Sequence, residues 1–392
     1  MNLTTMMVDP NVENRHGRYA RRLFNIVRVK FQMQERMKMV LVIVVVLSMW
    51  RMFSWSPSDD LLASYGIVLF TPREFARVCC DFGPTRFEFR NGFERGVCDY
   101  RKKIDDFRSF RMNRPISVYV AIIDLPQFIN DFFMKLSPEE SVVLITGQED
   151  FGPCELFNEG RLPQSELVSS ISLKSFLADT RLKHWFAQNH DVDRSCDSSL
   201  TALELHKIEA LPIGVDYHTR AEKTFFPFFR VSPAKQEEEL IKHSRKWLDK
   251  PLSLLALFQR DSEKPERGIL LDHLEPMRTC VVKSNHRLSE SESWILHGDA
   301  AFVLCPQGRG IDTHRLYEAL ALGSVPVVLT STLDTLYSEL PIIILKSLKS
   351  FPHCDTIRKW KVEIIQRFGQ DPFSNYNEVT LKNWKDRINK YL

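Results

Sequence analysis

The pattern of apolar and polar residues changes along the chain. A basic stretch precedes residue 39, and an apolar run then extends from Met39 to Trp50, interrupted by Ser48. Beyond residue 64, short apolar runs alternate with segments of helical or loop pattern. Such alternation is typical of α/β proteins with parallel sheets. The pattern therefore predicts an α/β fold that follows one N-terminal hydrophobic segment.

The short apolar runs predict strands in two series. In the first half, strands are expected at 117–123, 142–146 and 206–213, and the segments 128–136 and 173–188 are expected to be helices or loops. A polar helix is expected next, and the second series of strands follows it. This second half is expected to contain that helix at 236–248, strands at 252–258, 279–283, 302–305, 325–329 and 341–345, and C-terminal helices at 356–368 and 381–391.

The two series predict two doubly wound, Rossmann-like domains, at 65–225 and 226–392. The boundary lies within 214–235, a stretch that contains Gly214, Pro227 and Pro233. Ligands bind at the carboxyl ends of the strands in such sheets. Two domains of this kind that face each other across a cleft therefore form a natural binding site.

The N-terminal segment predicts a membrane anchor. Residues 1–38 carry an excess of Lys and Arg, and the span 39–55 is about the minimum length that crosses a bilayer as a helix. A cleaved signal peptide and a buried core element are the alternatives, but the basic region is long and no small-residue cleavage site follows it. The positive-inside rule makes 1–38 cytoplasmic and leaves a stem at 56–64 and all later residues in the lumen. We expect a single-pass type II protein of the Golgi or endoplasmic reticulum membrane.

Composition and cysteine placement narrow the function classes. Net charge is +3, which argues against a nucleic-acid partner. The eight cysteines all follow the predicted anchor, as expected in an oxidising lumen. No CxxC pair supports a zinc site. Cys305 lies in a strand pattern and is expected to be a free core thiol, whereas the pairing of the others stays open.

The stretch 302–328 contains most of the residues that are suited to ligand binding. It predicts a strand, a glycine-bearing loop, a helix from about His314, a stop at Gly323 and another strand. Glycines let backbone approach a ligand closely, and a helix N-terminus attracts anions such as a diphosphate. Arginine adds bidentate phosphate recognition, and a carboxylate one turn into the helix accepts hydrogen bonds from ribose hydroxyls. The residues predicted to bind a ligand here are Gly308, Arg309, Gly310, Asp312, Thr313, Arg315 and Glu318, with Asp312 or Thr313 as the helix cap.

The same stretch resembles a known family. Pro306-x-Gly308, Arg315-x-x-Glu318-Ala319 and Val325-Pro326-Val327, followed by Leu340-Pro341, resemble the donor-binding core of exostosin-type glycosyltransferases. The resemblance implies the two-domain GT-B fold and inverting transfer from a UDP-sugar, with 226–392 as the donor domain and 65–225 as the acceptor side. Arg260 and Arg267 resemble the arginines that neutralise the donor diphosphate in that family. The family commonly has Ser where this chain has Asp312 or Thr313.

Several polar residues near strand ends are candidates for a catalytic base. An inverting transfer needs one group that deprotonates the acceptor hydroxyl. Glu149 and Asp150 follow the strand at 142–146, and Asp216 and His218 follow the strand at 206–213. A solvated acidic loop or a polar turn is the alternative interpretation of these residues.

Other polar and aromatic residues favour structural roles. Asp191-Val-Asp193 matches a metal-binding Asp-x-Asp pair, but the residues before it do not resemble a strand, so no metal is expected. Trp185 with Asn189 and His190 could line a sugar site, although core packing of Trp185 is the stronger interpretation.

Together these observations predict a glycosyltransferase. Its partners are a nucleotide-sugar donor, expected to be a UDP-sugar, and a glycan or glycoprotein acceptor, and it needs no cofactor. One alternative is a GDP-sugar-dependent fucosyltransferase. Another is a lumenal protein that binds a sugar or nucleotide without turnover.

Overall fold

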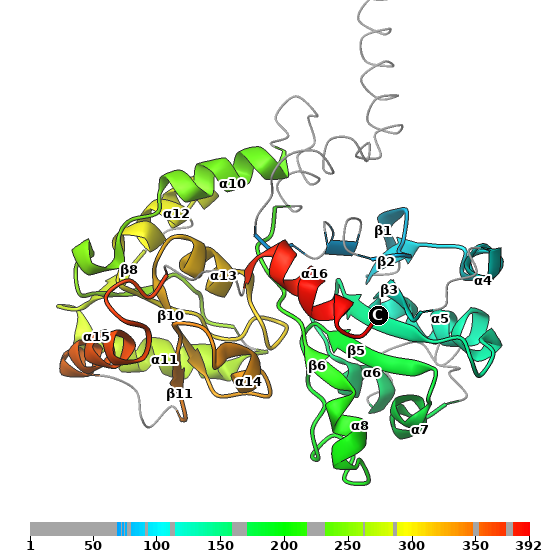
Figure 1. Cartoon of the computed structure of the whole chain (residues 1–392). Helices are drawn as coiled ribbons and strands as arrows, with labels where there is room; N and C mark the ends of the chain where they lie inside the picture. The colour runs from blue at the N-terminus through cyan, green and yellow to red at the C-terminus, as the bar shows by residue number, and fades with distance from the viewer. Residues whose placement is uncertain are drawn as a thin grey trace, which may run out of the picture. The chain divides into compact units, whose positions relative to one another are not determined.

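Two parallel sheets organise the computed structural model (Figure 1). The first sheet has the strand order β3-β4-β5-β6 within the described residues. Its strands are β3 (Ile116–Ala121), β4 (Val142–Gly147), β5 (Leu182–Ala187) and β6 (Ile208–Ala210). β3 and β4 are buried along their whole length because helices cover both faces of the sheet. An antiparallel hairpin, β1 (Arg86–Arg90) and β2 (Phe93–Val97), precedes this sheet.

The structure describes residues 69–71, 73, 75–76, 80–90, 93–109, 114–158, 171–217, 232–261, 263–284, 288–347, 353–373 and 379–392. All of them belong to one compact unit, formed by residues 59–224 and 230–392. The predicted tail, anchor and stem lie outside the described residues, as does the point at 225/226 where the sequence placed the domain boundary. No helix in the described part of the chain is long and apolar enough to cross a membrane.

Helices cover the first sheet on both faces. One face packs on a cluster that includes Phe128 of α5 (Leu125–Asp131) and Phe176 of α7 (Leu173–Ala178). The opposite face, with Tyr119 and Phe186, packs on the C-terminal helix. Further described helices of this half are α4 (Tyr100–Ser109), α6 (Pro153–Asn158) and α8 (Ala202–His206), with 3-10 turns at Ile122–Asp124 and Phe133–Lys135.

The second sheet is also parallel, with the order β11-β10-β9-β7-β8 among the described strands. Its strands are β7 (Leu254–Ala256), β8 (Val281–Lys283), β9 (Phe302–Leu304), β10 (Val325–Leu329) and β11 (Ile343–Leu345). β9 lies in the middle of this order, so the loop that follows it leaves from the centre of the sheet. That loop leads into α13 (His314–Ala321).

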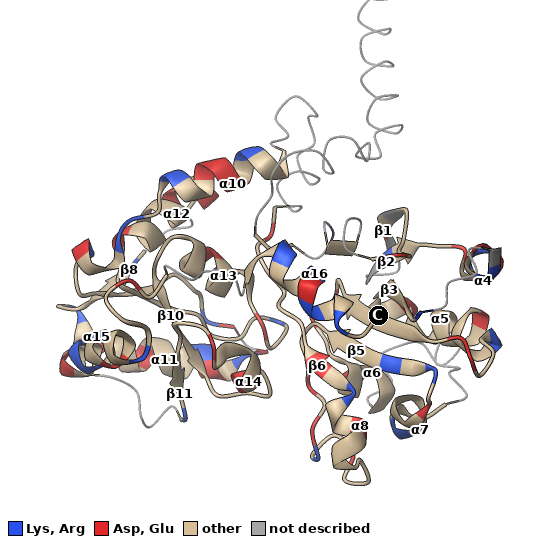
Figure 2. Ribbon diagram, in the orientation of Figure 1, with Lys and Arg blue, Asp and Glu red and all other residues tan. Residues whose placement is uncertain are grey.

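The helices of the second half also form two layers. One face of the sheet packs with α10 (Pro233–Lys242), α12 (Glu290–Asp299) and α13. The other face packs with α11 (Pro265–Leu274) and α15 (Cys354–Phe368). α10 and α15 carry charges of both signs, as expected of helices with one solvated side (Figure 2). A short helix α14 (Asp334–Tyr337) and 3-10 turns at Trp247–Asp249 and Glu275–Met277 complete this half.

The structure confirms the α/β class with parallel sheets and corrects one element. The segment 173–188 was expected to be helix or loop, but it contains both α7 and the strand β5. β5 pairs with β4 and β6 and is therefore an inner strand of the first sheet. Its sequence Leu-Lys-His-Trp-Phe-Ala breaks the apolar pattern of a buried strand, which explains why the pattern did not reveal it.

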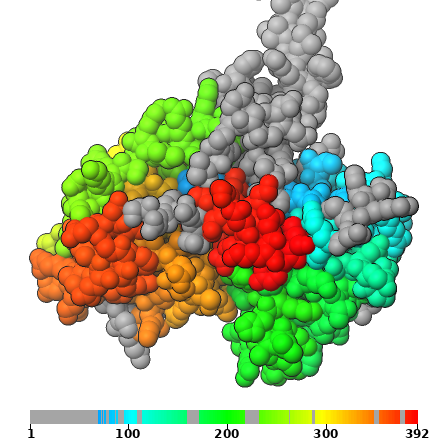
Figure 3. All heavy atoms as spheres, in the orientation of Figure 1, coloured from blue at the N-terminus to red at the C-terminus, as the bar shows by residue number. Residues whose placement is uncertain are grey.

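The C-terminal helix α16 (Leu381–Asn389) belongs with the first sheet, although the sequence assigned it to the second domain. Trp384 packs in one cluster with Phe70 and Phe186. The backbone N–H of Phe70 donates to Val379 at 2.8 Å, immediately before the helix. In Figure 3 this red C-terminal segment lies against the segments of the first half. The apolar stripe of α16 thus covers a sheet face that begins about 270 residues earlier in the sequence.

Disulfides join distant segments within each half. Cys154 pairs with Cys196 in the first half, and Cys280 pairs with Cys354 in the second. Cys305 is buried and free, as the strand pattern predicted.

Candidate functional site

A cavity of about 540 Å³ lies where the loop between β9 and α13 meets segments from the first half. The first-half segments follow β4 and β6, so the cavity lies at carboxyl ends of parallel strands, where doubly wound sheets bind ligands. Its lining consists of Asp150, Ile213, Asp216, Glu290, Ser293, Gly308, Arg309, Gly310, Asp312, Thr313, His314, Arg315 and Glu318.

The two glycines of the β9–α13 loop have different roles. A Cβ atom at Gly308 would meet only the guanidinium of Arg267, at 3.8 Å, so this backbone is open to a ligand. A Cβ atom at Gly310 would come within 2.6 Å of the Asn189 side chain and 2.7 Å of the Asp150 carbonyl. Gly310 therefore permits close packing against the first half, and Gly308 is the position that permits approach to a ligand.

Three arginines lie in or beside the cavity wall. Arg309 and Arg315 line the cavity. The Arg267 Nε donates to the Gln307 carbonyl at 2.9 Å, which places this guanidinium beside the glycine loop. Burial and the neighbouring Arg315 lower the pKa of Arg267, so the fold brings like charges together. Clustered cations of this kind favour an anionic ligand such as a phosphate.

Arg260 has a different environment. Its guanidinium forms an ion pair with Asp272 of α11 and is largely exposed. Neither Arg260 nor Arg267 is among the residues that line the cavity, and Arg267 also lies 3.8 Å from Asp261. Arg267 has the stronger geometric support because its hydrogen bond to Gln307 holds it beside the glycine loop, whereas Arg260 is largely exposed.

Asp312 connects the two halves. It is buried, and its carboxylate accepts hydrogen bonds from the Ile213 N–H at 2.9 Å and the Tyr317 hydroxyl at 2.6 Å. The N–H of Thr313 and the hydroxyl of Tyr337 donate to its other oxygen. Burial raises the pKa of Asp312, and these donors oppose the rise. Because both carboxylate oxygens are already occupied, the geometry favours a structural role over donor binding.

Helix α13 begins at His314, as predicted, with Thr313 at the N-cap position. The Thr313 side chain makes no capping hydrogen bond, so neither candidate cap satisfies the first turn through its side chain in the usual way. The N-cap residue Thr313 and the first helical residues, His314 and Arg315, line the cavity. A helix N-terminus of this kind favours an anion by its dipole and its open donors.

Glu318 lines the same cavity one turn into α13. Burial raises the pKa of its carboxyl to about 7, while His314 and Arg315 oppose the rise. The side chain still lies on the cavity wall and is only partly exposed. A carboxyl at this position can accept hydrogen bonds from hydroxyl groups of a ligand, as predicted for ribose.

The predicted catalytic bases are distributed unevenly. Asp150 and Asp216 line the cavity, so the structure brings both to the same site as Arg315 and Glu318. Glu149 does not line it, and its backbone carbonyl accepts a hydrogen bond from Asn189 at 2.9 Å. His218 lies outside the described residues.

Sequence reasoning missed His314, Glu290, Ser293 and Ile213 as lining residues. The His314 Nδ1 lies 2.7 Å from the Gly214 carbonyl oxygen. That contact joins residues 100 positions apart, and no local motif could reveal it. The position of His314 at the start of a helix after a glycine loop was the only signal in the sequence.

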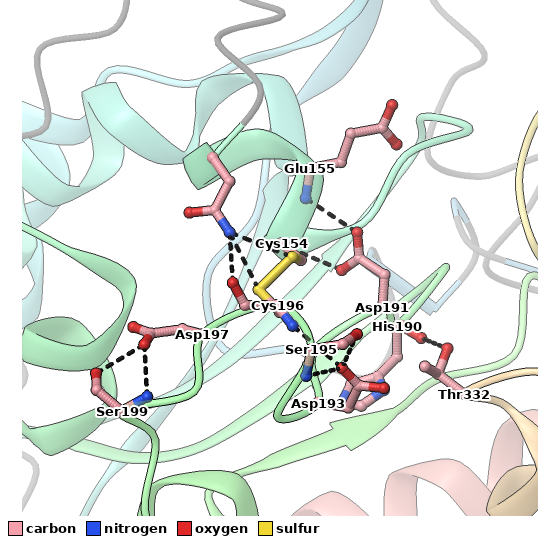
Figure 4. Close-up of a disulfide and its surroundings, with 11 residues drawn as sticks. Cys154, Glu155, His190, Asp191, Asp193, Ser195, Cys196, Asp197, Ser199 and Thr332 are labelled. Atoms are coloured by element: carbon pink, nitrogen blue, oxygen red, sulfur yellow. Dashed lines mark hydrogen bonds between the residues drawn. A yellow bond between two sulfur atoms is a disulfide. The ribbon is translucent and has the colours of Figure 1, made fainter.

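The Asp-x-Asp pair is engaged in local structure. Asp191 follows β5 closely, so the expectation that no strand precedes it was wrong. Its carboxylate accepts from the N–H groups of Cys154 and Glu155 at the start of α6, beside the disulfide (Figure 4). Asp193 accepts from the N–H and hydroxyl of Ser195. No cluster of three potential metal ligands occurs among the described residues.

Trp185 packs in the core, as the stronger interpretation predicted. It is fully buried, and its indole N–H donates to Thr146 at 2.9 Å. Asn189 is also buried and contacts both the β4 loop and the glycine loop. These contacts give Trp185 and Asn189 structural roles.

Comparison with known proteins gives distant structural likenesses. No family model matches the chain, and no curated protein matches it. The chain is similar to the trehalose-6-phosphate phosphatase N-terminal domain of Candida albicans, with 13% identity and a TM-score of 0.38 over 74% of this chain and 72% of that one. A structure described as trehalose-6-phosphate from E. coli bound with UDP-2-fluoro glucose has 14% sequence identity and a TM-score of 0.35, with 74% of each chain covered. The UDP-forming alpha,alpha-trehalose-phosphate synthase of Burkholderia vietnamiensis has 10% sequence identity and a TM-score of 0.33. The match covers 74% of this chain and 77% of that one.

Proposed function

We propose that this protein is a glycosyltransferase of GT-B type that transfers a sugar from a nucleotide-sugar, a UDP-sugar in the first instance, with inversion. One observation carries the proposal: a single cavity combines an open glycine backbone at Gly308, the N-terminus of α13, Arg315 and Glu318. Arg315 and the N-terminus of α13 are suited to bind a diphosphate, and Glu318 is suited to accept hydrogen bonds from a ribose. The motif resemblance to exostosin-type enzymes supports the same assignment.

The acceptor is proposed to be a hydroxyl of a glycan or glycoprotein. Asp150 and Asp216 reach the cavity from the first half, whereas the groups suited to the donor come mainly from the second. A donor bound at the glycine loop would therefore present its sugar toward the first-half side chains, where an acceptor hydroxyl can approach it.

No metal is included in the proposed mechanism. Leaving-group charge develops on the diphosphate as the sugar departs, and preorganised positive groups there stabilise the transition state. Arg267, Arg309, Arg315 and the first amides of α13 are the groups proposed for this task. Transfer should then continue in excess EDTA. Loss of transfer in EDTA with recovery on adding manganese would replace this mechanism by a metal-assisted one.

The decisive experiment is calorimetric titration of the full-length purified chain with UDP and with GDP, followed by transfer assays with radiolabelled UDP-sugars and GDP-fucose. The proposal expects UDP binding and transfer from a UDP-sugar. Preference for GDP would indicate the fucosyltransferase alternative. Binding of UDP without transfer to any glycan acceptor would indicate a protein without turnover.

We also propose a type II topology in the Golgi or endoplasmic reticulum membrane. The basic residues before 39, the apolar span 39–55 and the disulfides of the later part support this proposal. In sealed microsomes, protease should remove the N-terminal tail and leave the C-terminal part intact until detergent is added. Digestion of the C-terminal part without detergent would contradict the proposal.

A further inference from the structure

The imidazole of His314 is held in one tautomer by the backbone. His314 is the first residue of α13, and its Nδ1 lies 2.7 Å from the carbonyl oxygen of Gly214. A backbone carbonyl can only accept a hydrogen bond, so Nδ1 must carry the proton that is shared. In the neutral ring, Nε2 then holds a lone pair and no proton. The carbonyl of Gly214 thus fixes both the orientation and the basic atom of this side chain.

The backbone around this contact is also fixed. Gly214 has φ +69, and a Cβ atom there would lie 2.1 Å from the carbonyl oxygen of Phe70. The neighbouring N–H of Val215 donates to that same carbonyl at 3.0 Å. One residue earlier, the N–H of Ile213 donates to Asp312. The Gly214 carbonyl that orients His314 therefore belongs to a segment fixed by hydrogen bonds of the residues before and after it, Ile213 and Val215.

His314 lies where the proposed donor and acceptor meet. It lines the cavity together with Arg315 and Glu318 of its own helix, which face the proposed nucleotide. Its hydrogen-bond partner Gly214 belongs to the first-half segment that also brings Asp216 to the cavity. A side chain at this junction can reach a reacting hydroxyl without leaving the helix that binds the leaving group.

We propose that His314 is the general base of the transfer, an inference that rests on the proposed function and adds a catalytic residue to it. The acceptor hydroxyl gives its proton to Nε2 as its oxygen forms a bond to the anomeric carbon. The bond from that carbon to the diphosphate oxygen breaks, and its electron pair stays on the nucleoside diphosphate. The imidazolium then shares Nδ1–H with Gly214 and returns its extra proton to water. Orientation of one ring nitrogen by a fixed acceptor is the arrangement that makes histidine an effective base.

The carboxylates of the cavity are the competing bases. Asp150 is exposed at the end of its loop. Asp216 has interactions of its own, and Glu318 is assigned to ribose. Any pH profile must take account of every charged group that lines the cavity with His314: Asp150, Asp216, Glu290, Arg309, Asp312, Arg315 and Glu318.

The test uses His314→Asn and His314→Ala in the full-length chain. Asparagine can keep an N–H near the position of Nδ1 for the Gly214 carbonyl, but it lacks the basic Nε2. We expect His314→Asn to lower kcat at least about a hundredfold, the usual scale of a general base, with UDP affinity within about twofold of wild type. The rate of wild type should fall as pH is lowered, because a protonated base cannot accept the proton, and His314→Asn should lose this dependence. Added imidazole should restore part of the activity of His314→Ala.

Matched variants make the outcomes separable. Asp150→Asn and Asp216→Asn should each keep the fall in rate at low pH. A His314→Asn enzyme with wild-type kcat would overturn the inference while leaving the proposed function intact. So would loss of the low-pH dependence in Asp216→Asn but not in His314→Asn, or a fall in UDP affinity that accounts for the whole loss of rate. If wild type binds UDP but transfers no sugar, the proposed function fails first, and this inference fails with it.

Discussion

The side-chain oxygen of Asn189 accepts a hydrogen bond from the backbone N–H of Asp312 at 2.9 Å, across 123 positions of sequence. The amide nitrogen of the same side chain donates to the Glu149 carbonyl at 2.9 Å. One buried amide therefore connects the loop that carries Asp150 with the loop that carries the glycines. Asn189 adopts φ +49, a left-handed conformation that asparagine tolerates better than most residues.

Replacement of Asn189 should measure the strength of that connection. Asn189→Ala removes two buried hydrogen bonds and leaves a residue ill suited to a positive φ, so we expect the free energy of unfolding to fall by about 2–4 kcal/mol. Asn189→Gly loses the same hydrogen bonds but tolerates the backbone, and it should recover about 1 kcal/mol of that loss. Urea unfolding of the purified variants checks both values. Equal stability of Asn189→Ala and wild type would contradict the bridging role.

Glu318 should determine affinity for the nucleoside. Above pH 7, where this carboxyl with a pKa of about 7 is ionised, Glu318→Ala should weaken UDP binding by about 1.5–3 kcal/mol, the scale of hydrogen bonds to a charged group. The fold should survive because the side chain lines a cavity. Calorimetry compares this variant with Glu363→Ala, which removes an exposed carboxylate of α15 and should bind UDP as wild type does. Unchanged UDP affinity in Glu318→Ala would remove the ribose assignment.

The arginines should differ in importance. Neither arginine lines the cavity, but Arg267 is held beside the glycine loop by its hydrogen bond to Gln307, whereas Arg260 is exposed and forms an ion pair with Asp272. We expect Arg267→Ala to lower kcat about a hundredfold, as loss of one preorganised donor to the transition state commonly does. Arg260→Ala should change kcat by less than about tenfold, which steady-state kinetics with a UDP-sugar can resolve. A larger effect of Arg260→Ala would restore the role that its sequence position predicted.

Lys250 should make stability depend on pH. The ammonium is buried and donates to the Leu322 carbonyl and the Ser324 hydroxyl, each at 2.7 Å. Burial lowers its pKa to about 7, from the ordinary lysine value of 10.5. Between these two values the unfolded chain binds more protons than the folded chain, so the free energy of unfolding should rise with pH by up to about 1.4 kcal/mol per unit.

Comparison of variants isolates this contribution. Lys250→Met should show a smaller rise in stability between pH 7 and 9 than wild type, and Lys246→Met, at an exposed position, should follow wild type. Thermal or urea unfolding at several pH values supplies the measurement. A parallel pH dependence of Lys250→Met and wild type would show that the buried ammonium is not responsible.

The elements that could be predicted from sequence are those whose pattern is local. The apolar runs at β3, β4 and β10 predicted strands because both faces of these strands are buried. β5 was not predicted because Lys183 and His184 interrupt its apolar pattern. His184 is nevertheless buried, and its ring stacks on Tyr391, which follows α16. The strand therefore depends on a partner about 200 residues later, which a local pattern cannot show.

In the candidate site, too, some features follow from local sequence and others depend on residues far away in the chain. The glycine loop, the helix start at His314 and the position of Glu318 follow from one continuous motif. The roles of Gly310 and Asp312 depend instead on Asn189, Ile213 and Tyr337, which come from other elements. Asp312 was expected to bind the donor as a candidate helix cap, but its carboxylate accepts hydrogen bonds from protein groups of both halves.

The return of α16 to the first sheet has a consequence for synthesis in the cell. A chain that leaves the ribosome from its N-terminus would ordinarily complete its first domain before the second is made. Here the cluster of Phe70, Tyr119 and Phe186 lacks Trp384 and Ile388 until α16 has emerged. One apolar face of the first sheet therefore stays incompletely covered, by Phe70 and Phe75 but not by α16, while the second half is translated. Folding factors that shield this face would act late, and truncation of the chain before residue 381 would damage the half of the protein that is made first.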